Sequence, residues 1–176
     1  MEKTEKKVIL SLDVATKTGW ALYRNGSIIK HGTKCFHSDS RIKDFGEWLS
    51  EIIEKYQIAT IVAENIYREH DRTKDAVFWV LAKMQGVLEF ITNKNNIEFT
   101  LLNPLQIKNE IIPTTYKHQR KEDKQRMINR IQSLGYKLAN DKADDEADAI
   151  GILITYLQSR KLKIKYPLEK IGSIER

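Results

Sequence analysis

The chain has 176 residues, 41% of them hydrophobic, with a formal net charge of +6 and a pI of about 9.3. This length and composition predict one globular domain with its own core and exclude global disorder. The basic charge favours an anionic partner such as nucleic acid, although a basic surface without such a partner fits it too. Cys35 is the only cysteine, which excludes an internal disulfide and a Cys-rich zinc site; we expect it to be a buried or half-buried strand residue.

The N-terminal segment does not have the pattern of a targeting signal. Met1–Lys7 is charged and is followed by only a short apolar run, unlike a secretory signal peptide. No apolar stretch approaches the roughly 20 residues that a membrane span needs. We therefore expect no membrane association and a reducing, cytoplasm-like location.

Three N-terminal strands are predicted to form an antiparallel meander: Val8–Val14, Trp20–Tyr23 and Ser27–Lys34. The first run is short, apolar and rich in β-branched residues, which is typical of a strand buried on both faces. Ala15–Gly19 is a predicted turn, and Asn25-Gly26 is a strong signal for a tight hairpin.

Helices and strands alternate after this meander. Apolar residues at helical spacing predict helices at Ile42–Ile53, Ala76–Asn93, Glu122–Leu134 and Asp144–Leu157, with a candidate short helix at Leu105–Ile112. Strands are predicted at Ile58–Ala63, which ends at Glu64, and at Ile97–Leu102. Two polar stretches are predicted loops, Arg68–Asp75 and Thr114–Lys121, and Lys161–Arg176 is a basic C-terminal tail.

Without the short helix, the order of the elements is β-β-β-α-β-α-β-α-α. A helix that joins two buried strands makes them parallel, so the fourth strand is expected to run parallel to the first. The order predicts an α/β fold with a mixed five-stranded sheet, in which three antiparallel strands precede parallel βαβ units and helices cover both faces. This is the RNase H-like arrangement, expected as a single domain over residues 1–160 with the tail at 161–176.

Two carboxylates are predicted at the ends of buried strands. Asp13 lies near the end of an apolar strand, where an ionised carboxylate needs a compensating partner such as a divalent metal ion. Glu64 ends the parallel strand and comes within reach of the same ion. Each has a simpler alternative, because Asp13 also fits a cap of the following turn and Glu64 a strand end that has reached solvent.

Two further carboxylates open the last predicted helix. Asp145 and Asp148 lie three positions apart and project from one helix face, where they repel each other unless a cation lies between them. Acids also favour helix N-termini without a metal; Asp144 fits an N-cap, and Glu146 points elsewhere. Together, the four carboxylates on strands and helix suit Mg²⁺ or Mn²⁺, and they can hold two ions about 4 Å apart for phosphodiester hydrolysis. The histidines have no metal-ligand spacing and are assigned no role: His31, His37, His70 and His118.

Three segments resemble, in order and spacing, the motifs of RuvC-type Holliday junction resolvases. Leu10–Trp20 is similar to the first motif, in which a strand Asp precedes a small-residue turn ending in Thr-Gly-aromatic. Val62–Tyr67 is similar to the second, a strand-end Glu followed by an apolar-aromatic pair, and Ala143–Ile150 to the last, two Asp at a helix start. Val14-Ala15 replaces the family's usual Pro-Gly, which indicates a divergent branch such as that of a phage or other mobile element and leaves the preferred cleavage sequence open.

The resemblance implies a homodimeric, Mg²⁺-dependent endodeoxyribonuclease that makes paired symmetric nicks in four-way DNA junctions. It implies that two Mg²⁺, or Mn²⁺ in their place, are bound by Asp13, Glu64, Asp145 and Asp148, with Lys124 as a further catalytic residue. It also suggests DNA contacts by Tyr67, Arg68, Arg72, Lys74, Lys108 and Lys121. Solvated surface charges, and a buried core position for Tyr67, are the simpler alternatives.

The helix predicted at Ala76–Asn93 carries Phe78, Trp79 and Met84 in addition to its core stripe. This apolar surplus favours a second buried face and therefore a dimer seam, unless the helix lies wholly inside one subunit.

Two other functions fit parts of the pattern. A YqgF-type nuclease that trims ribosomal RNA precursors shares the fold and the acidic residues, but Thr18–Trp20 and the paired Asp145 and Asp148 favour the resolvase. A non-catalytic junction-binding protein is expected to lack at least one of the four carboxylates, and all four are present. An actin-like sugar kinase or ATPase needs two domains, and the chain is too short for both.

Overall fold

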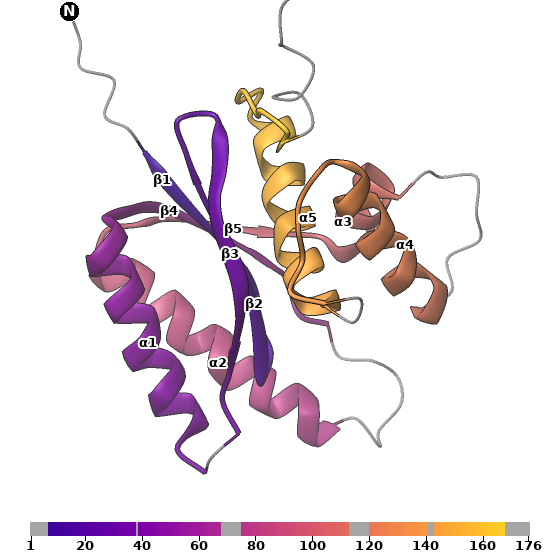
Figure 1. Cartoon of the computed structure of the whole chain (residues 1–176). Helices are drawn as coiled ribbons and strands as arrows, with labels where there is room; N and C mark the ends of the chain where they lie inside the picture. Colours follow the sequence, from indigo (N-terminus) through magenta and orange to yellow (C-terminus); the bar gives the residue numbers. More distant parts are fainter. Residues whose placement is uncertain (1–6, 38, 68–74, 113–119, 141–142, 168–176) are drawn as a thin grey trace, which may run out of the picture.

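The computed structural model of the chain describes residues 7–37, 39–67, 75–112, 120–140 and 143–167 (Figure 1). Five strands form one sheet in the order β3-β2-β1-β4-β5. The strands are β1 (Val8–Asp13), β2 (Lys17–Arg24), β3 (Ser27–Cys35), β4 (Ile58–Glu64) and β5 (Glu98–Leu102). Neighbours among β1, β2 and β3 pair antiparallel, whereas β4 runs parallel to both β1 and β5, which confirms the predicted RNase H-like mixed sheet.

Helices cover both faces of this sheet. One face carries α1 (Arg41–Tyr56) and α2 (Asp75–Lys94), and the other carries α3 (Pro104–Ile111), α4 (Arg120–Ser133) and α5 (Asp144–Ser159), as Figure 1 shows. Side chains alternate along β1, so Ile9 joins the core beneath α5 while Leu10 and Leu12 join the core beneath α1 and α2. The candidate short helix is confirmed as α3, which makes three helices after the last strand.

The turn between β1 and β2 is shorter than predicted. β2 begins at Lys17 rather than Trp20, because Thr18 closes the turn with its own side chain. The Thr18 hydroxyl donates a hydrogen bond to the Ala15 carbonyl (2.6 Å), and the Ala15 N–H donates to the same hydroxyl oxygen (3.3 Å). The early start of β2 brings Lys17 close to the end of β1.

Cys35 is exposed, so the expected buried or half-buried position is wrong. It is the last residue of β3, and β3 lies at the edge of the sheet, where its side chains are covered on fewer sides. The exposed position leaves the thiol open to solvent.

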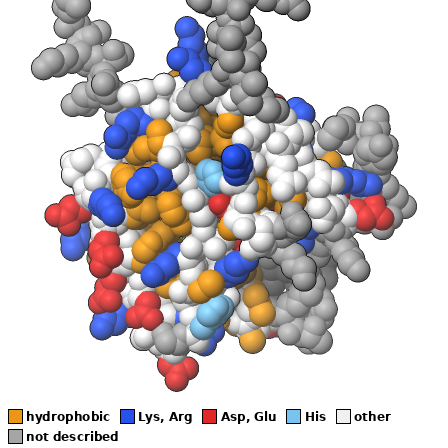
Figure 2. All heavy atoms as spheres, in the orientation of Figure 1, with side chains coloured by type: hydrophobic (Ala, Val, Ile, Leu, Met, Phe, Trp, Pro, Cys, Tyr) orange, Lys and Arg blue, Asp and Glu red, His pale blue; other side chains and the backbone are white. Residues whose placement is uncertain are grey.

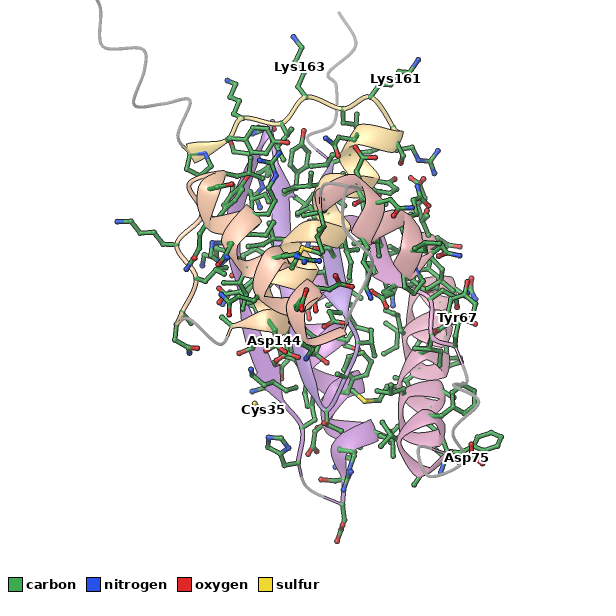
Figure 3. The ribbon with its side chains drawn as sticks, turned by 90° about the vertical axis from the view of Figure 1, so that its right-hand side faces the viewer. Cys35, Tyr67, Asp75, Asp144, Lys161 and Lys163 are labelled. Atoms are coloured by element: carbon green, nitrogen blue, oxygen red, sulfur yellow. The ribbon has the colours of Figure 1, made fainter. Side chains whose placement is uncertain are left out.

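The first residues of the predicted C-terminal tail pack on the β2–β3 hairpin. The Tyr23 hydroxyl donates a 2.6 Å hydrogen bond to the carbonyl of Lys163. Figure 3 places Lys161 and Lys163 at one end of the molecule, away from Asp144 and Tyr67, which lie nearer its middle. The tail from residue 168 onward lies outside the described part of the chain.

Charge is unevenly distributed over the face drawn in Figure 2. Lys and Arg side chains are scattered across it, whereas Asp and Glu side chains gather mainly along the edge that carries α1.

None of the helices within the described ranges is long and apolar enough to cross a membrane.

Candidate active site at the ends of β1 and β4

A cavity of about 650 Å³ opens where β1 and β4 end, beside the first turn of α5. All four predicted metal ligands line it: Asp13, Glu64, Asp145 and Asp148. A larger cavity of about 1320 Å³ lies between α1 and α2, but its glutamates are exposed on the surface of α1. The smaller cavity therefore holds the buried acidic chemistry and is the candidate active site.

The two strand carboxylates lie side by side because of the sheet register. β1 and β4 are parallel neighbours, and Leu12 pairs with Ala63. Asp13 and Glu64 are the next residues of the two strands, so both reach the same edge of the sheet. The prediction that parallel strand ends bring them together is consistent with this register.

Gly19 allows α5 to approach the end of β1. It pairs with Asp13 across the antiparallel β1–β2 ladder, and a Cβ atom at this position would lie only 1.7 Å from the backbone carbonyl oxygen of Asp145. A side chain at this position would force β2 and α5 apart. The Thr-Gly pair of the first motif thus has a structural reason, because the glycine lets the carboxylates at the start of α5 lie close to Asp13.

Tertiary contacts hold the first turn of α5 in place. The helix begins after Ala143, which offers no side-chain cap, so the expected N-cap role of Asp144 is wrong. Asp144 is instead the first helical residue and forms an ion pair with Lys124. One turn further along, the buried Ser11 hydroxyl donates a 2.7 Å hydrogen bond to the carbonyl of Ala149.

Burial and mutual repulsion raise the proton affinity of the carboxylates. Burial, followed by the charges of Asp148 and Glu64, holds the pKa of Asp13 well above its ordinary value. Burial, followed by the charge of Glu64, raises the pKa of Asp148 to about 7, and burial also raises the pKa of Glu64. A bound cation would remove the repulsion and favour the ionised forms.

Lysines lie close to these carboxylates, and one of these lysines, Lys17, was not predicted as a site residue from the sequence. Lys17 pairs with Asp145 at 2.6 Å (Nζ to Oδ2), from its position at the start of β2. Its signal in the sequence was its place in the turn after Asp13, within the first motif. Of the predicted lysines, Lys124 pairs with Asp144, and the charge of Lys108 partly offsets the raised pKa of Glu64.

Asp123 is a second residue that the sequence reading missed. It lines the cavity, is buried, and lies 3.5 Å from the Nζ atom of Lys108 and 3.6 Å from the guanidinium of Arg126. Two cations beside it compensate the buried carboxylate. One of them, Lys108, is itself only part-exposed at the cavity wall.

The donor set fits divalent magnesium or manganese. Oxygen ligands from two strand ends and one helix suit these ions, and the repulsion between the carboxylates is the kind that a cation relieves. No three such side chains within the described ranges are already gathered closely enough to hold an ion. One of the four, Asp145, is paired with Lys17, so ion binding requires side-chain movement.

The predicted DNA-contact residues divide into three groups. Tyr67 and Lys108 line the cavity. Tyr67 is 56% exposed, so the alternative of a buried core tyrosine is wrong. Its hydroxyl accepts a 3.4 Å hydrogen bond from the side-chain amide of Asn103. Three predicted contacts lie outside the described residues: Arg68, Arg72 and Lys74. The backbone of Lys121 lies in α4, but its side chain is outside the described set.

Apolar side chains are exposed along α2. Three of them are more than half exposed: Val77, Trp79 and Phe90. Met84 and Leu88 lie on the side of the helix that is buried in the core. Trp79 and Phe90 share the opposite side, whereas Val77 lies two turns before Met84 on the buried side and is exposed near the start of the helix. In the single chain, α2 therefore presents an apolar face to solvent.

Two comparisons concern the sequence. A family model described as crossover junction endodeoxyribonuclease RuvC matches residues 14–156, which begin directly after Asp13 and include Glu64, Asp145 and Asp148. The chain is also 28% identical, over 145 residues, to crossover junction endodeoxyribonuclease RuvC of Fusobacterium nucleatum. That alignment covers 80% of this chain and 72% of the relative.

Solved structures agree in fold. The structure of T. thermophilus RuvC in complex with a Holliday junction substrate matches with a TM-score of 0.67 and 13% identity, over 88% of this chain and 96% of that one. The yeast mitochondrial Holliday junction resolvase Ydc2 matches with a TM-score of 0.64 and 15% identity, over 89% of this chain and 80% of that one. At such identities the likeness supports the fold, and the family model supports the assignment. The chain belongs to the RuvC family of crossover junction endodeoxyribonucleases.

Proposed function

We propose that this chain resolves Holliday junctions as a homodimer, by making paired symmetric nicks in four-way DNA through metal-dependent hydrolysis. The observation that carries the proposal is the convergence of Asp13, Glu64, Asp145 and Asp148 on one cavity. Solved relatives in the comparison include T. thermophilus RuvC and the fowlpox virus resolvase, each in complex with Holliday junction DNA. The RuvC family typically uses Mg²⁺, and we place its action in the cell interior, where DNA and Mg²⁺ are both present.

The four carboxylates are proposed to hold two Mg²⁺ ions, which Mn²⁺ can replace. When bound, such ions activate the attacking water and stabilise the leaving oxygen. The chain itself supplies the negative charge and fixes its donors on β1, β4 and α5, which are packed elements rather than loops. Because Asp13 and Asp148 are half-buried, their charge is screened less than that of an exposed carboxylate.

The lysines of the cavity are proposed to act on the phosphate. Lys108 is part-exposed beside Glu64, and an ammonium there can stabilise the charge that develops on the scissile group. Lys124, half-exposed and paired with Asp144, is proposed to contribute in the same way. Tyr67 is proposed to stack on an unpaired base near the junction centre, because its ring is exposed at the cavity wall.

The apolar face of α2 is proposed as the dimer seam. Trp79 and Phe90 are exposed on one side of α2 in the single chain, and a second copy that packs on them would remove this apolar area from water. Two active sites related by a two-fold axis would match the symmetry of a four-way junction. That match would give paired nicks in strands of like polarity.

The test is cleavage of an end-labelled synthetic four-way junction in Mg²⁺ and in EDTA, beside a linear duplex of the same sequence and a structured RNA. The proposal predicts paired, symmetric nicks on the junction only, and only with metal. Cleavage of the RNA without junction nicks would instead support the YqgF-type ribosomal RNA nuclease. Tight, metal-independent junction binding without any cut would support an architectural junction-binding protein.

A further inference from the structure

Glu146 occupies a central position in the first turn of α5. It lies one residue after Asp145 and two before Asp148, and only 3% of it is exposed. The helix has no side-chain N-cap, because Ala143 stands at the cap position. The orientation of this turn, and of both carboxylates on it, therefore depends on contacts with other elements.

Both oxygens of the Glu146 carboxylate are used in such contacts. Its Oε1 atom accepts a 2.6 Å hydrogen bond from the Nδ1 atom of His31 on β3, and its Oε2 atom accepts a 2.9 Å hydrogen bond from the Ala139 N–H between α4 and α5. His31 is itself held edge-on against the ring of Tyr136, with 6.2 Å between ring centroids. A buried carboxylate with two donors links the helix start to an edge strand and to the preceding loop.

We propose that His31 and Glu146 are positioning residues for the metal site, and that they fix the first turn of α5 so that Asp145 and Asp148 face Asp13 and Glu64. The sequence reading gave neither residue a role. The inference rests on the proposed metal-dependent function. Glu146 does not line the cavity, so it acts through the helix backbone rather than on an ion or on DNA. A small rotation of this turn moves both helix ligands together.

Mn²⁺ binding to the protein without DNA tests the proposal. In a titration that follows the electron paramagnetic resonance signal of free Mn²⁺, Glu146→Ala is expected to weaken affinity by about 10- to 100-fold, as for other groups that orient metal ligands. Glu146→Gln is expected to restore most of this loss, because its amide oxygen can accept from the Ala139 N–H and its NH₂ can donate to Nδ1 of His31 in the tautomer that carries its hydrogen on Nε2. A merely structural role predicts no such difference in Mn²⁺ affinity once each variant is folded.

A matched control lies at the other end of the same helix. Tyr156 is buried, and its hydroxyl donates a 3.4 Å hydrogen bond to Glu98, far along α5 from the ligands. Tyr156→Phe is expected to lower the thermal midpoint slightly, because an intramolecular hydrogen bond contributes only modestly to stability. The Mn²⁺ affinity is expected to stay within about twofold of that of the parent protein, because the lost bond lies far from the first turn of α5. If Tyr156→Phe weakens Mn²⁺ binding as much as Glu146→Ala, general loosening of α5 explains both and the proposal is wrong.

A second variant keeps the test decisive if Glu146→Ala does not fold. His31→Phe retains an aromatic ring against Tyr136 but removes the donor to Glu146, and it is expected to weaken Mn²⁺ affinity in the same direction. Unchanged affinity in folded His31→Phe and Glu146→Ala proteins would overturn the positioning role. Asp13→Asn separates this outcome from failure of the proposed function: if it also binds Mn²⁺ normally, the metal site itself is misassigned.

Discussion

Replacing Gly19 with alanine is expected to displace the first turn of α5 and to lower the rate of junction cleavage by about 100-fold. The added Cβ would lie 1.7 Å from the Asp145 carbonyl oxygen, whereas real Cβ contacts are essentially never below 3.0 Å. The atoms that this Cβ meets belong to the α5 backbone and cannot rotate away, so β2 and α5 must separate by more than 1 Å. A shift of about that size in an active site can cost about 10²-fold in rate. The overpacking itself is expected to cost about 1–3 kcal/mol of stability.

The assay is single-turnover cleavage of a labelled four-way junction at saturating Mg²⁺, with urea unfolding measured on the same preparation. Gly151→Ala is the matched control, because it also replaces a glycine by alanine, this time within α5. Its new Cβ would meet the flexible side chain of Met127 at 3.0 Å instead of backbone atoms. It is expected to retain most of the cleavage rate. Cleavage by folded Gly19→Ala at the parent rate would refute the argument that close approach of α5 assembles the site.

Three further predictions address charge and assembly. Lys17→Met should tighten Mn²⁺ binding up to about fivefold, because a part-exposed ion pair with Asp145 contributes at most about 1 kcal/mol; weaker binding in an Mn²⁺ titration would contradict it. The raised pKa of Asp148 means that the metal-free folded state binds a proton at this carboxyl more tightly than the unfolded chain does. Protonation of Asp148 therefore stabilises the fold; this stabilisation is fully present below pH 3.8 and is lost as the pH rises to about 7. In EDTA, Asp148→Asn should therefore gain stability relative to the parent across that interval, as followed by urea unfolding, and a constant difference would argue against the raised pKa. Trp79→Glu should shift the chain to monomer in analytical ultracentrifugation and abolish paired nicking, whereas a dimer that persists in this variant would exclude the α2 seam.

The sheet was predictable because its pattern is local. β1 is an apolar, β-branched run buried on both faces, and the helix that follows the meander fixes β4 as its parallel neighbour. Asp13 and Glu64 were predictable for the same reason, since each ends such a strand. Their convergence with the α5 carboxylates follows from topology rather than from any contact that the sequence displays.

The contacts that orient the site were not predictable. His31 and Glu146 are 115 positions apart, and no local pattern pairs an edge-strand histidine with a helix glutamate. Lys17 was assigned to a turn, because the hydroxyl of Thr18 that shortens this turn leaves no periodic signal. The exposure of Tyr67 likewise depends on which elements pack around it, which hydrophobic spacing does not specify.

The central claim is that the carboxylates at the ends of β1 and β4 and at the start of α5 form the nuclease site. Its most direct test compares Asp13→Asn with the parent protein in cleavage and in binding of the same four-way junction. The claim predicts no detectable nicking by Asp13→Asn at any Mg²⁺ or Mn²⁺ concentration, with junction binding equal to or tighter than that of the parent, because one metal ligand and one negative charge near the phosphate are removed. Near-normal nicking by Asp13→Asn would contradict the assignment of the site.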